Sequence, residues 1–271
     1  MLVVVLGCKS NPDKIISSNK KTDSVKLKAS FYPSFIPRSE LLIYQKDSGY
    51  IISLNANHNL QKESYRDSCY TISFIEERKF DSIDYNYIRN NFSRFDPFKE
   101  DYNDTGFDGI GVEINYPFKN IRDTIGFWSP RRKKNPLLYK EIIDPLFFVM
   151  NKYFKEEIEM VYIEHLEEYF NMGLPFKKIS DNPLKYRLYG TILYDNKIAL
   201  SNFMDSLPTD KSIIINASNF SGIEQNLQSE FLELINQHPH IIWVADSISK
   251  LELVKIGINK KSIISNEKEA I

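Results

Sequence analysis

Residues 212–244 read SIIINASNFSGIEQNLQSEFLELINQHPHIIWV, and this stretch decides the fold class of the C-terminal part of the chain. Ile213-Ile214-Ile215 and Ile241 to Val244 are continuous apolar runs, which are typical of strands that are covered on both faces. The residues between them, from Gly222 to Gln237, have the apolar spacing of a helix. Because two strands joined through a helix need a crossover connection, the stretch predicts a parallel sheet.

The same alternation continues on both sides of this stretch. We expect further strands at 186–192 and 262–265 and further helices at 197–206 and 248–256. The order predicts a small α/β domain with a mainly parallel sheet over residues 184–266. The segment from Asn171 to Pro183 contains Gly173 and Pro175 and lacks apolar periodicity, which predicts a domain boundary there.

Several residues of this unit resemble the STAS domain, the α/β module of anti-sigma factor antagonists and of anion-transporter tails. Leu188 to Thr191 resembles the first strand of that family with its glycine, and Ser212 to Phe220 resembles the central strand and the loop after it. Ile256-Gly257-Ile258 resembles the end of the last helix. Since the family binds partners or nucleotides, the resemblance implies a recognition module that makes and breaks no substrate bonds.

Ser221 has two interpretations. In the STAS family a serine near this place accepts phosphate, although the Asp-Ser pair of that family is absent here, and free N–H groups at a helix N-terminus would stabilise the added charge. From the residues alone, Ser221 caps the following helix, and Glu224 three positions later completes a capping box. The residues favour the cap.

The preceding part, residues 31–175, predicts an α+β domain in which an antiparallel sheet is backed by helices. Its strands are predicted by short runs in which apolar and polar residues alternate, separated by turns rich in Asp, Asn and Gly. Its helices are predicted by apolar residues at four-residue spacing. The helix that begins at Pro136 should be kinked by Pro145. We expect strands at 40–45, 50–54, 69–76, 109–116 and 124–128, and helices at 81–95, 136–154 and 156–170.

The N-terminus, Met1 to Leu6 followed by Gly7-Cys8, resembles a bacterial lipobox. In that family the chain is cut after a small residue, and the following cysteine receives diacylglycerol, so the resemblance implies that residues 1–8 are a signal remnant and that Cys8 anchors the protein in the bacterial cell envelope. Residues 9–30 should then be a flexible tether, because the first part of this segment is polar. In the alternative, residues 1–8 form the first strand of a cytoplasmic protein.

Composition narrows the classes of partner. Lys and Arg total 35 against 36 Asp and Glu, and the net charge of -1 provides no overall field for nucleic acid. The two cysteines, Cys8 and Cys69, exclude a disulfide-stapled scaffold, and Cys69 should be a buried, inert thiol in a strand. We therefore expect a protein partner, and no nucleic acid.

No catalytic residue, cofactor or metal is predicted. Asp101 to Gly109 places oxygens as a calcium loop does, but Val112 stands where the closing carboxylate is needed, which favours a turn. An enzyme would require Asp101, Asp108 and Glu113 to converge with distant residues. The histidines lack metal-ligand spacing: His165 should be a hydrogen-bonded core residue, and His238 and His240 should be surface residues. The glutamates near His165 should form a solvated face; they are Glu164, Glu167 and Glu168.

The best candidate for binding is Phe127 to Lys134, where an aromatic pair ends a predicted strand and a basic loop follows. Trp128, Arg131 and Arg132 could stack on and pair with a planar or acidic ligand. In the alternative, the aromatic pair lies in or beside the core and the charges are in solvent. The sequence thus predicts a membrane-tethered, non-enzymatic protein-binding module, for which an immunity-type role would fit. The alternative is a cytoplasmic regulator with a STAS-like binding domain.

Overall fold

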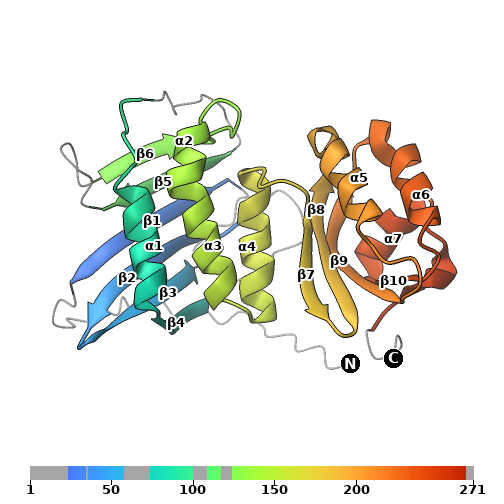
Figure 1. The fold of residues 1–271 in the computed structure, drawn as a ribbon, viewed down its shortest axis with the longest axis horizontal. Coiled ribbons are helices and arrows are strands. Elements are labelled where there is room, and N and C mark those ends of the chain that lie inside the picture. Colours follow the sequence, from blue (N-terminus) through green and yellow to red (C-terminus); the bar gives the residue numbers. More distant parts are fainter. Residues whose placement is uncertain (1–23, 35, 58–73, 100–108, 117–123, 267–271) are drawn as a thin grey trace, which may run out of the picture.

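The computed structural model describes residues 24–34, 36–57, 74–99, 109–116 and 124–266, which form two lobes side by side (Figure 1). The first lobe contains a six-stranded, wholly antiparallel sheet in the order β4-β3-β2-β1-β5-β6. The predicted antiparallel sheet backed by helices is therefore confirmed. Its strands are β1 (Val25–Pro33), β2 (Arg38–Lys46), β3 (Gly49–Asn57), β4 (Phe74–Phe80), β5 (Ile110–Asn115) and β6 (Thr124–Trp128).

The strand β1 corrects the predicted tether. Residues 25–30, which were expected to belong to a flexible segment, lie in a central strand between β2 and β5. Leu27, Ala29 and Phe31 are buried at every second position, whereas Lys26 and Lys28 between them point to the other face. The two lysines lowered the mean hydropathy of the stretch, although its residues alternate with the period of a strand. The sheet of the first lobe therefore begins earlier than residue 31.

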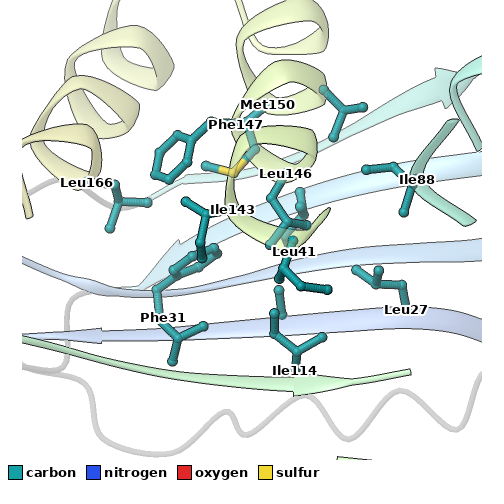
Figure 2. Packing of buried hydrophobic residues seen from close by; sticks show 14 of the residues in the cluster. Leu27, Phe31, Leu41, Ile88, Ile114, Ile143, Leu146, Phe147, Met150 and Leu166 are labelled. Carbon is teal, nitrogen blue, oxygen red and sulfur yellow. The ribbon is translucent and has the colours of Figure 1, made fainter. Parts of the chain in front are cut away.

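Helices cover one face of this sheet and complete the first core. They are α1 (Ser82–Phe92), α2 (Pro136–Leu138), α3 (Asp144–Tyr153) and α4 (Glu157–Tyr169), and α1, α3 and α4 lie across the strands (Figure 1). Figure 2 shows Phe31, Leu41 and Ile114 of the sheet beneath Leu146 and Phe147 of α3.

A π-helical turn, Tyr139–Ile143, stands where the sequence predicted a kink at Pro145. A proline inside a helix conflicts with the carbonyl group four residues earlier, which here belongs to Glu141 within the turn. The wider hydrogen bonds of a π turn accommodate this conflict, and the chain continues as α3.

The second lobe contains a five-stranded mixed sheet in the order β11-β10-β9-β8-β7. The strands β8 (Leu184–Ile192), β9 (Ile213–Ile223), β10 (Ile241–Val244) and β11 (Ile263–Ile264) run parallel, and β7 (Phe176–Asp181) pairs antiparallel with β8. Helices α5 (Lys197–Asp205), α6 (Gln228–Asn236) and α7 (Ser247–Lys255) connect the parallel strands. The sequence missed β7, which falls inside the predicted boundary, because its exposed Lys178 and Ile179 obscure the alternation of an edge strand.

The strand β9 is longer than predicted, and this overturns the capping interpretation of Ser221. The strand pairs with β8 as far as Ile223, so Ser221 is an exposed strand residue, and α6 begins only at Gln228. Glu224 accepts a hydrogen bond from the backbone N–H of Tyr194 at 2.7 Å and closes no capping box. The buried side chains of Phe220 and Ile223 extend the strand past the polar residues that had suggested a loop.

Candidate functional site

The site begins with Trp128 at the end of β6. Ile125 and Phe127 of this strand are buried on the face of the sheet that the helices cover, and the half-buried Trp128 lies on the opposite face. None of the described helices covers that opposite face (Figure 1). The strand stops at Ser129, whose hydroxyl accepts a hydrogen bond from the backbone N–H of Ile110 at 2.9 Å.

The register of the strands places Tyr32 and Trp128 on either side of Gly111. Tyr32 of β1 pairs with Gly111 of β5, and Gly111 pairs with Trp128 of β6. A Cβ atom at Gly111 would lie 3.4 Å from Cε3 of Trp128 and 3.5 Å from Cβ of Tyr32. Both aromatic side chains therefore lie in van der Waals range of the β5 backbone at Gly111.

Arg38 extends this arrangement on the other side of Tyr32. Its guanidinium carbon lies 5.5 Å from the centroid of the Tyr32 ring, within the range of a cation–π contact. We call Arg38, Tyr32, Gly111 and Trp128 the aromatic row. The row crosses from β2 to β6 and spans roughly 14 Å, given the spacing of about 4.8 Å between neighbouring strands. Tyr32 is 38% exposed and Arg38 is exposed, so the row is open to a partner.

The two arginines that sequence analysis grouped with Trp128 occupy other positions. Arg132 donates to both carboxylate oxygens of Asp144, at 2.8 and 2.6 Å, and its guanidinium lies 4.5 Å from the ring centroid of Tyr139. The hydrogen bonds that Arg132 donates to Asp144, opposed by partial burial, raise the pKa of Arg132. Arg131 is exposed, and its backbone N–H donates to the side chain of Asn135 at 3.1 Å. Of the predicted binding residues in this segment, Trp128 lies in the row.

A second unusual arrangement joins the lobes through α4, which lies between the helices of the first lobe and strands β7 and β8 of the second (Figure 1). Arg187 of β8 donates to Glu164 at 2.7 and 3.1 Å and to Glu157 at 2.9 and 3.0 Å. The side chains of Glu164 and Arg187 are 0% and 5% exposed. Asn219 of β9 donates a further hydrogen bond to Glu164 at 3.2 Å.

One turn further along α4, Glu167 receives three donors. The hydroxyl of Tyr189 donates at 2.7 Å, the side-chain amide of Asn151 at 2.7 Å, and the ammonium of Lys177 lies 2.6 Å away. Burial, reinforced by the charge of Glu167, raises the pKa of Tyr189, which keeps the phenol protonated as a donor. We call these linked side chains the junction network; its members are Asn151, Glu157, Glu164, Glu167, Lys177, Arg187, Tyr189 and Asn219.

Comparison with protein-family models, curated proteins and solved structures found no match. The site is therefore interpreted from its geometry alone.

The structure corrects two expectations about charged and polar residues near α4 and α6. Glu164 and Glu167 are buried in the junction network and do not form a solvated face, whereas Glu168 is exposed as expected. The reason is a second sheet packed on the acidic side of α4, which the helix sequence by itself does not reveal. His238, expected at the surface, is 6% exposed because the turn after α6 folds it inward, and His240 is exposed.

His165 of α4 lies at the edge of the core and has a side-chain partner. It is partly exposed, and its Nδ1 atom lies 3.3 Å from Glu168. The hydrogen bond agrees with the expectation for this residue, but the burial is only partial.

Several predicted sites lie outside the described residues. They are the lipidation site Cys8, the thiol Cys69 and the loop from Asp101 to Asp108. Within the described ranges, no helix is long and apolar enough to cross a membrane, and no three His, Cys, Asp or Glu side chains converge as metal ligands.

The sequence missed Tyr32, Arg38 and the junction network for two different reasons. The alternation of apolar residues over 25–33 was a usable signal for β1, and it would have placed Tyr32 on the face away from the core. The junction network gave no local signal, because its members come from α3, α4, β7, β8 and β9.

Proposed function

We propose that this protein is a non-enzymatic binding protein, held at a membrane by a lipid on Cys8, which presents the aromatic row to a protein partner. The observation that carries the proposal is the position of Tyr32, Trp128 and Arg38 on a sheet face without a covering helix. Trp, Tyr and Arg are the residue types that contribute most to binding energy at protein interfaces.

The row defines the chemistry of the partner. Tyr32 and Trp128 meet over Gly111 and present aromatic surface, which suits an apolar side chain of the partner. Arg38 has no carboxylate partner among the described residues, so it suits an Asp or Glu next to that apolar side chain. We therefore expect the partner to present an apolar residue beside a carboxylate.

The junction network supports a binding role in two ways. It ties two sheets and the shared helix α4 into one frame, which reduces the entropy lost when a partner docks on the first sheet. Its carboxylates are also occupied: Glu164 receives Arg187 and Asn219, and Glu167 receives Tyr189, Lys177 and Asn151. A carboxylate engaged in this way is a poor general base.

A photo-crosslinking residue placed at position 128 of the full chain, in its native host, tests the docking face. Position 194, where Tyr194 is 50% exposed on the second lobe, provides the matched control. We expect position 128 to capture one envelope protein through a peptide that contains Asp or Glu, and we expect Tyr32→Ala to abolish the capture. Equal capture at both positions, no capture, or capture unaffected by Tyr32→Ala would refute the proposal.

The lipid anchor has its own test. Metabolic labelling with alkyne palmitate should mark the wild type and Cys69→Ala, and Cys8→Ala should lose the label. Residues 9–24 separate Cys8 from β1, and a chain of this length spans at most roughly 55 Å, so the aromatic row would remain near the membrane. Labelling that persists in Cys8→Ala would exclude this anchor.

The alternative is a cytoplasmic regulator whose second lobe has a STAS-like fold and binds a partner. Its support is Gly190, which has a φ of 56° where the resemblance places a glycine, together with the parallel pairing of β8, β9 and β10. The position of Ser221 within β9 weakens the phosphorylation that such a role would use. Under this alternative, palmitate labels neither the wild type nor any of the variants. For the membrane-tethered protein, an immunity-type role is a further proposal.

A further inference from the structure

A pocket of about 140 Å³ opens beside the junction network, between the C-terminal end of α4 and strand β8. One water molecule needs only roughly 15 Å³ of such space, so the pocket can hold a small organic group. Its apolar wall includes Met172, Pro175 and Leu193, and its polar wall includes Glu168, Asn171 and Thr191. Tyr189 also lines it.

The chain holds Glu168 in a fixed place at this pocket. Its Oε1 atom accepts a hydrogen bond from the backbone N–H of Thr191 at 3.1 Å. Gly190 permits this approach, because a Cβ atom there would lie 2.0 Å from Oε1 of Glu168, and its φ of 56° is one that glycine adopts freely. The backbone of β8 is thus shaped around the carboxylate of α4.

The charge at the pocket is unbalanced. Glu167 is neutralised by Lys177, at 2.6 Å. Glu168 has only His165 beside it, at 3.3 Å, and the described residues offer it no Lys or Arg. A cationic ligand would supply the missing charge, and the apolar wall would cover a short hydrocarbon chain.

We propose that this pocket binds an alkylammonium group, either of a small free amine or of a lysine side chain. An ammonium has three N–H donors. Three of the residues that line the pocket have side chains with acceptor oxygens: Glu168, Thr191 and Asn171. The Oε2 atom of Glu168 also lies 3.3 Å from Nδ1 of His165. This inference stands independently of the aromatic row.

Other cations fit less well. Calcium requires six to eight oxygen ligands, and Glu167 already shares its oxygens with three donors. A guanidinium prefers two free carboxylate oxygens in one plane, but the backbone N–H of Thr191 occupies one oxygen of Glu168.

Titration of the full chain with n-butylammonium, followed by isothermal calorimetry, tests the pocket, and n-butanol provides the neutral probe of the same shape. We expect saturable binding of n-butylammonium and none of n-butanol. Glu168→Gln should weaken binding roughly tenfold or more, because it removes the charge and keeps an acceptor for Thr191. Thr191→Val should weaken it several-fold.

The matched control is Glu233→Gln, since Glu233 is an exposed glutamate on α6 away from the pocket. Thermal unfolding of each variant checks that the fold persists. Equal weakening in Glu168→Gln and Glu233→Gln, equal binding of n-butanol, or no binding of n-butylammonium would overturn the proposal.

A second ligand separates the two sources of the amine. If Nα-acetyl-lysine amide binds as n-butylammonium does, the pocket accepts a lysine side chain. If only n-butylammonium binds, its ligand is a small free amine. Crosslinking at position 128 is a separate measurement, so failure here leaves the proposed docking face untouched.

Discussion

The two arginines Arg132 and Arg187 form similar hydrogen-bonded ion pairs in different surroundings. Arg132 pairs with Asp144 near the surface, where their side chains are 45% and 37% exposed. Arg187 pairs with Glu164 between two sheets, where both side chains are almost completely buried. Surface ion pairs contribute little to stability, whereas removing one member of a buried pair leaves an uncompensated charge.

The comparison indicates that removal of a charge lowers the free energy of unfolding most at the buried contact between the lobes. The exposed pair lies within the first lobe, and its loss would be compensated by water. The buried pair joins α4 of the first lobe to β8 of the second, so its loss affects how the lobes unfold. The predictions below first change buried side chains between the lobes and then an exposed ion pair there.

The largest effect is expected from Arg187→Met. Glu164 would remain buried without its cation, and we expect the free energy of unfolding to fall by roughly 3–5 kcal/mol. Tryptophan fluorescence in urea reports on both lobes, because the two tryptophans, Trp128 and Trp243, lie one in each, so a lobe that unfolds by itself gives a step of its own. We expect coincident transitions in the wild type and separate transitions in the variant. A loss below about 1 kcal/mol would show that water reaches Glu164.

The second variant, Arg187→Met with Glu164→Leu, removes both charges. Replacing a buried pair by apolar side chains of similar size is often neutral or stabilising. We therefore expect the double variant to recover most of the stability that Arg187→Met loses, with coincident transitions restored. A double variant as unstable as the single one would show that the ion pair has a role in packing which apolar residues cannot replace.

The third variant, Tyr189→Phe, removes one donor to Glu167 and keeps Lys177 and Asn151. We expect a loss of roughly 1–2 kcal/mol at pH 7. Burial raises the pKa of Tyr189, so its contribution is fully present below the ordinary tyrosine value of about 10 and is lost as the pH rises above it. We expect the wild type to exceed the variant in free energy of unfolding by less at pH 11 than at pH 8, and urea unfolding at both pH values measures this. The same difference at both pH values would contradict the assignment of this stability to the protonated hydroxyl of Tyr189.

The same comparison explains what the sequence could predict. The order of the alternating elements from Leu184 onward and the strands β5 and β6 follow from local apolar patterns and were predicted, whereas the end of β9 and the start of α6 were not. The burial of Glu164 and Glu167 was not, because a glutamate on a helix is usually solvated, and the cations that pair with these two come from other elements, Arg187 of β8 and Lys177 of β7. Trp128 was selected as a strand-end aromatic, but its partners Tyr32 and Arg38 come from strands that are distant in sequence.

The smallest effect is expected from Lys133→Met, which removes an exposed pair across the same junction. Lys133 lies 2.9 Å from Asp195, and the two side chains are 86% and 59% exposed. Like the Arg187 pair, this contact joins the two lobes, but water solvates both charges after the change. We expect no measurable change in the free energy of unfolding, and the two tryptophan transitions should remain coincident. Separate transitions in this variant would mean that contact between the lobes, and not burial of the charge, determines their coupling.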